Sequence, residues 1–397
     1  MIKIEGGVTA PKGFKAAGLR AGVKPTATKK DMALIVSECD AVCAGTFTLN
    51  KVKAAPVKWD QAIVDTRETV RAMVANSGVA NACTGVKGME NCRIMAEAVA
   101  KHYDGMVAED VLVLSTGVIG AQLPMDVICK GADMLVDALD DSVQAADDAA
   151  NAILTTDTRK KEIAVQIEID GTTVTIGGMC KGAGMIHPNM GTMLGFITTD
   201  VAINKELLVK ALKGNIDDTF NMVSVDGDTS TNDTVVIMAN GMAGNKLIDK
   251  EDESFEKFNQ ALYVINEYLA KSIAGDGEGA TKLFEVQAYG AATKEDAKLL
   301  SKAVVCSSLT KAAVFGRDAN WGRILCAMGY SGAEFDPEVV DITLKSEAGE
   351  LAIVKDGVAT DYSEEFATEI LSQNPVIAIV DAKAGASSAT AWGCDLT

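Results

Sequence analysis

A glycine-rich polar segment, KGAGMIHPNMGTML, runs from Lys181 to Leu194 and leads into an apolar stretch. Gly191 directly precedes Thr192 in it, and glycine can take backbone conformations that are closed to other residues. A strained peptide before a hydroxyl residue favours an N→O acyl shift, in which the hydroxyl attacks the preceding carbonyl and water then opens the ester. The freed α-amine would lie beside the hydroxyl and serve as its base. The segment therefore predicts self-cleavage and a threonine nucleophile; the alternative is a glycine-rich loop before a buried strand.

A second segment, STGVIG from Ser115 to Gly120, directly follows a run that is typical of a strand. Small residues at such a turn let neighbouring backbone N–H groups point outward together, as an oxyanion hole requires. The alternative interpretation is a plain turn between a strand and a helix.

Two further polar segments contain acidic residues. DGEGATK, residues 276–282, sets a carboxylate among glycines, where it could meet a cationic substrate group; a helix C-cap with surface charges explains the same pattern. DGDTSTNDT, residues 226–234, hints at calcium, but no glutamate follows at the EF-hand position and a strand begins instead. We interpret this fourth segment as a hydrogen-bonded turn that lines the site.

Composition excludes several classes of function. The formal charge of −18 over 397 residues disfavours nucleic acid as a partner. Nine cysteines without a CxxC pair argue against a disulfide framework or a zinc site, and two histidines exclude a histidine-rich metal site. We expect neither a metal nor a bound cofactor. The first residues do not resemble a signal peptide and no apolar run is long enough to span a membrane, so the expected location is the cytoplasm.

Periodicity predicts helices and strands along the whole length, and hence an α/β or α+β fold. Helices are expected over residues 91–103, 125–139, 205–220 and 254–273, and strands over 110–114, 234–238, 283–288 and 376–380. Residues 161–179 are expected to form a hairpin that turns at Asp170-Gly171. The strands that occur in such pairs argue against a purely parallel, doubly wound sheet.

Taken together and in this order, these segments resemble the ornithine acetyltransferase family, the glutamate N-acetyltransferases of arginine biosynthesis. The resemblance rests on the four segments above and on others that extend it from Gly6 to Thr397. These are GTFTLNKVKAAPV from Gly45, NSGVANACTG from Asn76, TTDT from Thr155 and FGRDANWGR from Phe315.

The resemblance implies a mechanism and a set of residues. Family members cut themselves before the threonine of the first segment, and their α and β chains stay together, usually as an α2β2 heterotetramer. By this match the cut falls between Gly191 and Thr192, which gives an α chain of residues 1–191 and a β chain of residues 192–397. Thr192 is then the nucleophile that becomes acetylated and Thr116 and Gly117 form the oxyanion hole. The implied substrate-binding residues are Thr155, Lys181, Thr192 and Glu278.

The implied fold is an N-terminal-nucleophile-like, layered α/β sandwich with a smaller second lobe. Two features depart from the family pattern. Gly191 stands where many members carry alanine, and members usually continue beyond the position of Thr397 with an asparagine and a hydroxyl residue that touch substrate. Those last two contacts are not assigned in this sequence.

Three functions are compared. The first is acetyl transfer from N-acetyl-L-ornithine to L-glutamate, which some members supplement with acetyl-coenzyme A as donor. The sequence has neither a GxGxxG nor a Walker loop, but coenzyme A binds without either, so this second donor stays open. The second function is a self-cleaving aminopeptidase or amidohydrolase, which differs in whether water or an amine resolves the acyl-enzyme. The third is a non-catalytic acidic binding protein, which predicts an uncut chain.

Overall fold

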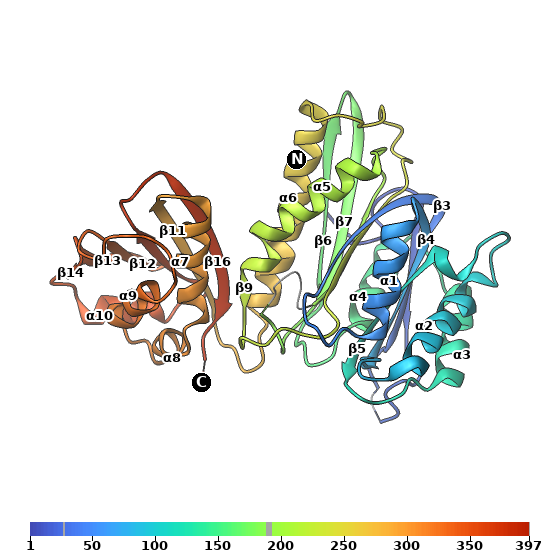
Figure 1. Ribbon diagram of the computed structural model, residues 1–397, viewed down its shortest axis with the longest axis horizontal. Helices are drawn as coiled ribbons and strands as arrows, with labels where there is room; N and C mark the ends of the chain where they lie inside the picture. Colours follow the sequence, from blue (N-terminus) through green and yellow to red (C-terminus); the bar gives the residue numbers. More distant parts are fainter. Residues whose placement is uncertain (27, 188–192, 397) are drawn as a thin grey trace. The chain divides into compact units, whose positions relative to one another are not determined.

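The computed structural model describes residues 1–26, 28–187 and 193–396, which form two compact units (Figure 1). Of the described residues, unit 1 holds those of 1–182, 193–217 and 229–269, and the smaller unit 2 holds 183–187, 218–228 and 270–396. Both sides of the predicted cut thus contribute residues to each unit. The division into an α chain of residues 1–191 and a β chain of residues 192–397 stays a prediction.

Unit 1 is built on nine strands. In the order of their pairing they run β1-β6-β7-β8-β10-β3-β4-β5, and β2 pairs with β3. Only β8 with β10 and β4 with β5 are parallel among these pairs, which confirms that the sheet is not purely parallel. The strands are β1 (Ile2–Ile4), β2 (Phe14–Leu19), β3 (Met32–Phe47), β4 (Thr69–Val79), β5 (Val111–Val118), β6 (Lys161–Ile169), β7 (Thr172–Lys181), β8 (Leu194–Thr199) and β10 (Thr234–Ala239).

The long strand β3 connects two halves of this sheet. Its pairing with β4 shifts register between Val36 and Ala41, and beyond this irregularity it pairs with β10. One buried cluster contains residues of β4 and β5 together with Met179 of β7 and Phe196 of β8. The two halves of the sheet therefore pack face to face across a shared apolar core.

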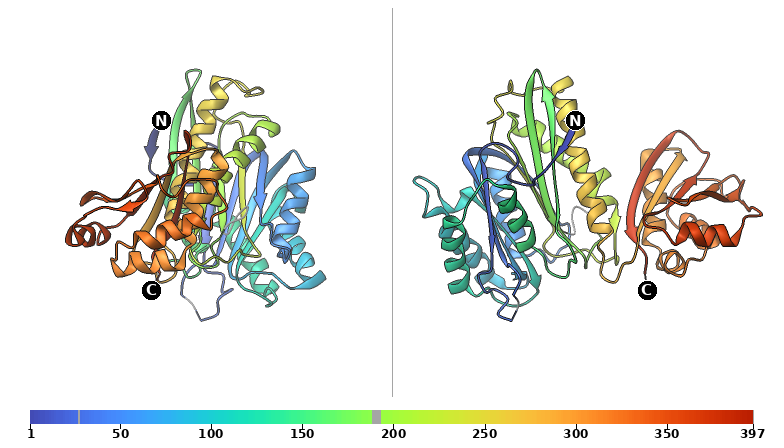
Figure 2. Two further views of the ribbon diagram at one scale, coloured as in Figure 1. Left: turned by 60° about the vertical axis from the view of Figure 1, so that its left-hand side comes forward. Right: turned by 180° about the vertical axis from the view of Figure 1, so that it is seen from behind.

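Helices cover the sheet halves on the outside (Figure 2). Alternate residues of β3, β4 and β5, such as Leu34 and Val74, face a second buried cluster with α2 and α3, as the two-residue period of a strand requires. On the other half, Gly178 of β7 lies against Ile265 and Leu269 of α6. The helices are α1 (Ala55–Thr66), α2 (Gly85–Ala100), α3 (Met125–Asp137), α4 (Val143–Ala152), α5 (Lys205–Asp218) and α6 (Glu253–Ala274), with a 3-10 turn η1 (Ala108–Asp110). The predicted layered α/β sandwich is confirmed.

Local predictions agree closely with these elements. The predicted helix over residues 254–273 is α6, and the predicted hairpin is β6 with β7. Its turn residues Asp170 and Gly171 have φ values of 50° and 78°, as a two-residue hairpin turn of type I′ requires.

Unit 2 contains a seven-stranded mixed sheet in the order β14-β13-β12-β15-β11-β16-β9. Helix α7 packs on β11 and β16, where Leu300 and Val304 are buried with Trp392. The strands are β9 (Val223–Ser224), β11 (Leu283–Ala291), β12 (Asp341–Ser346), β13 (Gly349–Lys355), β14 (Val358–Ala359), β15 (Val376–Asp381) and β16 (Ser387–Cys394). The helices are α7 (Lys294–Cys306), α8 (Ser308–Gly316), α9 (Trp321–Gly329) and α10 (Glu364–Leu371), with a 3-10 turn η2 (Phe220–Met222).

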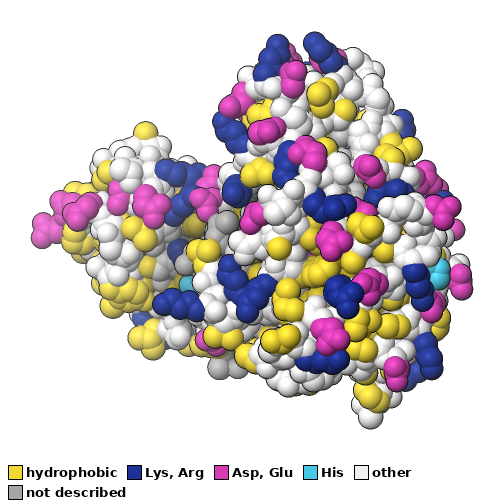
Figure 3. Space-filling view, turned by 45° about the vertical axis from the view of Figure 1, so that its right-hand side comes forward, with side chains coloured by type: hydrophobic (Ala, Val, Ile, Leu, Met, Phe, Trp, Pro, Cys, Tyr) yellow, Lys and Arg dark blue, Asp and Glu magenta, His cyan; other side chains and the backbone are white. Residues whose placement is uncertain are grey.

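Within the described ranges, no single helix has the length and apolar character to cross a membrane; only the bent pair α7 and α8 passes by length and composition. In α7 this apolar character serves the core of unit 2, where Ala297, Leu300 and Val304 are fully buried. On the face drawn in Figure 3, acidic and basic side chains alternate over the surface.

The open edge of the unit 1 sheet at β5 is covered by α1. Trp59 Nε1 donates to the Val111 carbonyl over 3.1 Å, and Val113 N donates to Asp60 Oδ1 over 2.7 Å. Two side chains of one helix thus satisfy backbone groups of an edge strand, which protects that edge and fixes the strand that carries Thr116.

Asp60 predicts a pH dependence of stability. It is fully buried, its Oδ2 accepts no hydrogen bond among the described residues, and burial raises the pKa of this carboxyl well above its usual range. The folded pKa exceeds the unfolded value of about 3.9, so the folded state binds more protons and its stability falls as pH rises from that value through the folded pKa. Asp60→Asn keeps an oxygen for Val113 and does not ionise.

We therefore expect Asp60→Asn to have a higher melting temperature than the wild type at pH 8, with a gap that narrows towards pH 4. Thermal unfolding followed by circular dichroism in steps of pH measures this. Asp65→Asn, on the exposed side of α1, is the matched control and should follow the wild type. Profiles of Asp60→Asn and wild type that stay parallel over this range would contradict the role given to Asp60.

Candidate active site

The predicted oxyanion residues lie where β5 ends beside β4. Gly117 is paired with Gly78, and a Cβ at Gly117 would come within 2.2 Å of the Gly78 carbonyl carbon. Gly117 also has a φ of 131°, which residues with side chains rarely adopt. The close approach of two backbones explains why this turn uses glycine.

Buried side chains form hydrogen bonds with the backbone on either side of this turn. Ser115 Oγ donates to Asn76 Oδ1 over 2.7 Å, and Asn76 Nδ2 donates to the Val79 carbonyl over 2.9 Å. Asn232 Nδ2, from the fourth polar segment, donates to the carbonyls of Ser115 and Ala80 over 2.8 and 2.6 Å. Asn232 therefore links the start of β10 to the end of β5 across the core, a role that its sequence position does not reveal.

Lys181 lies at the same place. It ends β7, is only 7% exposed, and its Nζ donates to Thr116 Oγ1 over 3.4 Å. Its register partner on β8 is Leu194, and Met193 before it is held by a hydrogen bond from Thr234 N to its carbonyl over 2.9 Å. Three separate parts of the chain thus meet where β8 begins.

Asp157, within the TTDT segment, organises this part of unit 1. Its Oδ1 accepts from Lys161 Nζ and from Gly182 N, both over 2.7 Å, and its Oδ2 accepts from Thr155 N over 3.1 Å. Lys181 Nζ is 3.9 Å from Oδ2. One carboxylate therefore positions both Thr155 and Lys181, two of the four predicted substrate-binding residues.

The charge on Asp157 is retained in spite of its burial. Burial acts to raise its pKa, but attraction to Lys181 and Lys161 and the hydrogen bonds to the carboxylate outweigh it, and the pKa falls to about 2. The Asp157 and Lys161 side chains are both 0% exposed. A buried ion pair of this kind is costly to break by removing one partner.

A second cation, Lys24, borders the same residues. Its Nζ donates to the carbonyl of Leu154 over 2.9 Å, and its stem lies where a Cβ of Gly78 would come within 2.7 Å of Lys24 Cγ. Burial lowers the pKa of Lys24, and the charge of Lys181 adds to this shift. The sequence alone does not identify Lys24 or Asp157 as residues of the site, because charged residues in loops are common and usually exposed.

Glu278 belongs to unit 2, in the turn that follows α6. It is exposed, its N–H donates to the Ala183 carbonyl over 2.8 Å, and its carboxylate lies beside Gly184. Nζ of the neighbouring Lys282 lies 3.7 Å from Asp395 Oδ2. Gly191 and Thr192 lie outside the described residues.

The two histidines have different surroundings. His102 contacts Asp133 over 2.7 Å at the surface, whereas Nδ1 of the half-buried His187 lies 3.0 Å from Ser224 Oγ and 3.7 Å from Cys306 Sγ. Burial lowers the pKa of His187. Nowhere along the described chain do three or more His, Cys, Asp or Glu side chains gather as metal ligands would.

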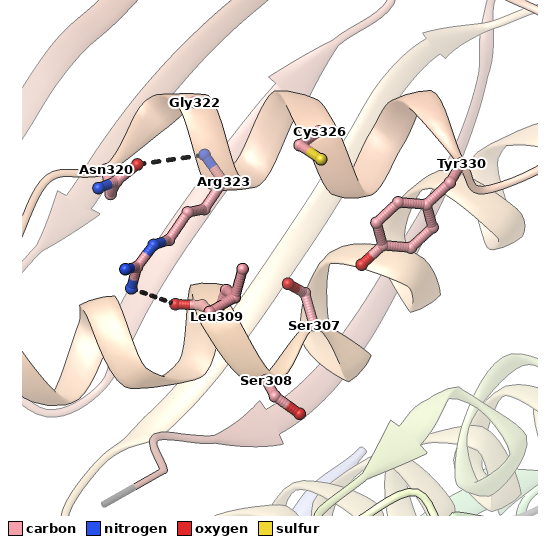
Figure 4. A pocket seen from close by; sticks show the side chains of 8 residues that line it. All are labelled: Ser307, Ser308, Leu309, Asn320, Gly322, Arg323, Cys326 and Tyr330. Atoms are coloured by element: carbon pink, nitrogen blue, oxygen red, sulfur yellow. Dashed lines mark hydrogen bonds between the residues drawn. The ribbon is translucent and has the colours of Figure 1, made fainter.

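The FGRDANWGR segment joins α8 to α9 in unit 2. Arg317 ends α8 with a φ of 57°, Asn320 caps α9 by accepting from Arg323 N over 3.2 Å, and Arg323 Nη1 donates to the Leu309 carbonyl over 2.8 Å (Figure 4). A surface hollow of about 280 Å³ lies between these helices. It is lined by Ser307, Ser308, Leu309, Asn320, Gly322, Arg323, Cys326 and Tyr330. The polar residues of this segment thus serve the helix junction.

Comparison with known proteins identifies the family. A family model described as the ArgJ family matches residues 15–397. The chain belongs to the ArgJ family. The arginine biosynthesis bifunctional protein ArgJ of Caldanaerobacter subterraneus subsp. tengcongensis is 50% identical over 394 residues, which cover 99% of this chain and 96% of the relative. The glutamate N-acetyltransferase of Methanocaldococcus jannaschii is 49% identical over 403 residues, covering 100% and 97%.

A solved structure of an ArgJ protein is also similar. The crystal structure of the arginine biosynthesis bifunctional protein ArgJ of Bacillus halodurans superposes with a TM-score of 0.50 at 47% sequence identity. The match covers 52% of this chain and 95% of that chain, so the solved chain is about half as long as this one. These comparisons confirm the family that the sequence segments resembled.

The buried pair of Asp157 and Lys161 allows structure and activity to be separated in this ArgJ chain. Asp157→Asn leaves the Lys161 charge without its carboxylate, so we expect a loss of about 3–5 kcal/mol in the free energy of unfolding. The double variant Asp157→Leu/Lys161→Met removes both charges and should recover part of that loss, because Lys161 is no longer left unpaired. Recovery is not complete, because Gly182 N and Thr155 N still lose their acceptor. Acetyltransferase activity should stay low in both variants, because Lys181 and Thr155 have lost their common partner.

Chemical denaturation and steady-state kinetics measure the two effects. Lys160→Met, which removes an exposed neighbouring charge, serves as the control and should change neither by much. Full activity in a stable double variant would show that Asp157 only stabilises the fold.

Proposed function

We propose that this chain is a self-cleaving acetyltransferase that moves the acetyl group of N-acetyl-L-ornithine to L-glutamate through an acetylated Thr192. The observation that carries the proposal is the meeting of the Thr116-Gly117 turn with Lys181 where β8 begins. Its support is the identity of about 50% to relatives named arginine biosynthesis bifunctional protein ArgJ and glutamate N-acetyltransferase.

The first step is the cut between Gly191 and Thr192. The Thr192 hydroxyl attacks the Gly191 carbonyl, the peptide C–N bond breaks, and the nitrogen takes up a proton as the ester forms. Water then cleaves the ester, which leaves a carboxylate on Gly191 and a free α-amine on Thr192. That amine is the base that the transfer needs, in a site where neither histidine is assigned this role.

The transfer then runs in two half-reactions. The Thr192 hydroxyl attacks the acetyl carbonyl and gives its proton to its own α-amine, and the oxyanion is stabilised by donors of Thr116 and Gly117. Ornithine leaves as the C–N bond breaks and takes the proton from the Thr192 amine. Glutamate attacks the acetyl ester in the reverse sense, which regenerates Thr192 and releases N-acetylglutamate.

Both substrates share an α-carboxylate, which Lys181 binds with the Thr155 segment beside it. The side chains differ, because ornithine ends in an ammonium group and glutamate in a carboxylate. Glu278 binds the ammonium end. Asp157 keeps Lys181 oriented, so that the common part of both substrates meets a fixed cation.

The half-length chain of the solved Bacillus halodurans relative supports the cut. β8 pairs with β7 on one side and with β10 on the other, which supports the further proposal that the α and β chains stay together after the cut. We also propose that the active protein is an α2β2 heterotetramer and that it is located in the cytoplasm. Acetyl-coenzyme A is a candidate second donor. A self-cleaving aminopeptidase or amidohydrolase shares every step except the last, in which water replaces glutamate.

Self-cleavage predicts two chains of 191 and 206 residues on a denaturing gel, and a single peak on size exclusion. Thr192→Ala should give one intact chain, because no hydroxyl remains to attack. Thr199→Ser, a conservative change at the far end of β8, is the control that should still be cut. A wild-type protein that stays whole after long incubation at neutral pH would contradict the proposal.

Transfer through an acetyl ester predicts ping-pong kinetics, with parallel lines in double-reciprocal plots when both substrates are varied. Glu278→Gln should raise KM for N-acetylornithine about tenfold, as the loss of one charged contact would, and change KM for glutamate much less. Glu295→Gln, an exposed change on α7, is the control. Intersecting lines would point to direct transfer in a ternary complex, and equal effects on both KM values would remove the assigned role of Glu278.

A further inference from the structure

A short strap of backbone, Ala183–His187, belongs to unit 2, although the chain before it belongs to unit 1. The strap contains no helix or strand, and Ala183 and Ile186 are buried at 0% and 1% exposure. Five residues with so little apolar surface need polar contacts to stay in place.

The carboxylate of Asp226 supplies the main contacts. Its Oδ2 accepts from Met185 N over 2.7 Å, and its Oδ1 accepts from Ile186 N over 2.9 Å and from Asp228 N over 3.0 Å. Met185 has a φ of 58°, a left-handed conformation that is unfavourable for a residue with a side chain. Two adjacent N–H groups that converge on one anion explain how this conformation is held.

The residues next to Asp226 hold the end of the strap. Val225 N donates to the Ile186 carbonyl over 2.6 Å, and His187 Nδ1 lies 3.0 Å from Ser224 Oγ. Residues 224–226 thus contact three consecutive strap residues through backbone and side chain alike.

The beginning of the strap contacts Glu278. Glu278 N donates to the Ala183 carbonyl over 2.8 Å, and a Cβ at Gly184 would lie 2.5 Å from Glu278 Oε1. Ala183 therefore fixes the backbone of Glu278, and the missing side chain of Gly184 leaves room for the Glu278 carboxylate. Asp226 and Glu278 are connected through four residues of one strap.

We propose that Asp226 is a positioning residue that, through the strap, fixes the Glu278 carboxylate and with it the preference for a substrate with a cationic end. In this proposal Asp226 acts through its contacts with the strap and not through a contact with substrate. The expected effect on substrate preference rests on the proposed function, in which Glu278 binds the ammonium group. The anchoring of the strap by Asp226 is independent of that role.

The first test measures the anchoring without any activity. Asp226→Asn keeps the shape of the side chain but turns an acceptor towards a backbone N–H into a donor, so the amides of Met185 and Ile186 lose protection. Hydrogen exchange followed by mass spectrometry on the native protein should show faster exchange in the peptide that contains residues 183–187. Asp228→Asn removes the same charge two residues away, and this control should exchange like the wild type. Unchanged exchange in Asp226→Asn would overturn the proposal.

The second test measures the substrate preference. Asp226→Asn should raise KM for N-acetylornithine about tenfold, which is the effect of weakening one charged hydrogen bond, and leave KM for glutamate within about twofold. Gly184→Ala leaves Asp226 intact and crowds the Glu278 carboxylate, so it should produce the same selective rise with normal exchange. Gly214→Ala, where a Cβ meets no neighbour, is its control.

The outcomes separate this proposal from the proposed function. If Glu278→Gln raises KM for N-acetylornithine but Asp226→Asn and Gly184→Ala do not, the positioning role is overturned and the proposed function stands. If Glu278→Gln has no selective effect, the role of Glu278 in the proposed function fails, and the positioning of a substrate group by Asp226 is overturned with it.

Discussion

The arrangement of the candidate active site depends on strand β8, which is hydrogen-bonded on both sides. It pairs antiparallel with β7 and parallel with β10. It begins at Leu194, opposite Lys181, and its whole length is buried. A strand in this position cannot leave the sheet without breaking two ladders of backbone hydrogen bonds, which are costly to leave unpaired in the interior. A chemical cut before the strand would therefore leave β8 paired in the sheet.

The register shift in the pairing of β3 with β4, between Val36 and Ala41, is the second feature on which the site depends. Because the two sheet halves pack face to face, the end of β5 comes close to the end of β7, where Lys181 Nζ donates to Thr116 Oγ1. Asn232 links the end of β5 to the start of β10. The close approach of Gly117 and Gly78 and the covering of the β5 edge by Asp60 keep the turn in place. Asp157 then holds Lys181 and Thr155 beside this turn. In the proposed mechanism, preorganised dipoles and charges of this kind would favour the developing charge of a transition state more than the neutral substrate.

The sequence predicts most of the elements and part of the site. The hairpin turn at Asp170-Gly171 and the apolar period of α6 are local signals, and each locates its element to within a few residues. Contacts that join distant segments carry no such signal. Asp157 has its partners at Thr155, Lys161, Gly182 and Lys181, and nothing in the spacing of a loop aspartate reveals that a buried lysine compensates it. The sequence places Asp226 in a turn, but its link to the strap depends on tertiary packing.

The central claim is that Thr192 carries the acetyl group between two substrates. It is tested most directly by the intact mass of both chains after the protein is mixed with N-acetylornithine alone and quenched in acid. The account predicts that the chain of 206 residues gains the mass of one acetyl group, located on its first residue, and loses it when glutamate is added. Turnover of the donor and acceptor together, with no acetylated chain detectable from the donor alone, would contradict the account.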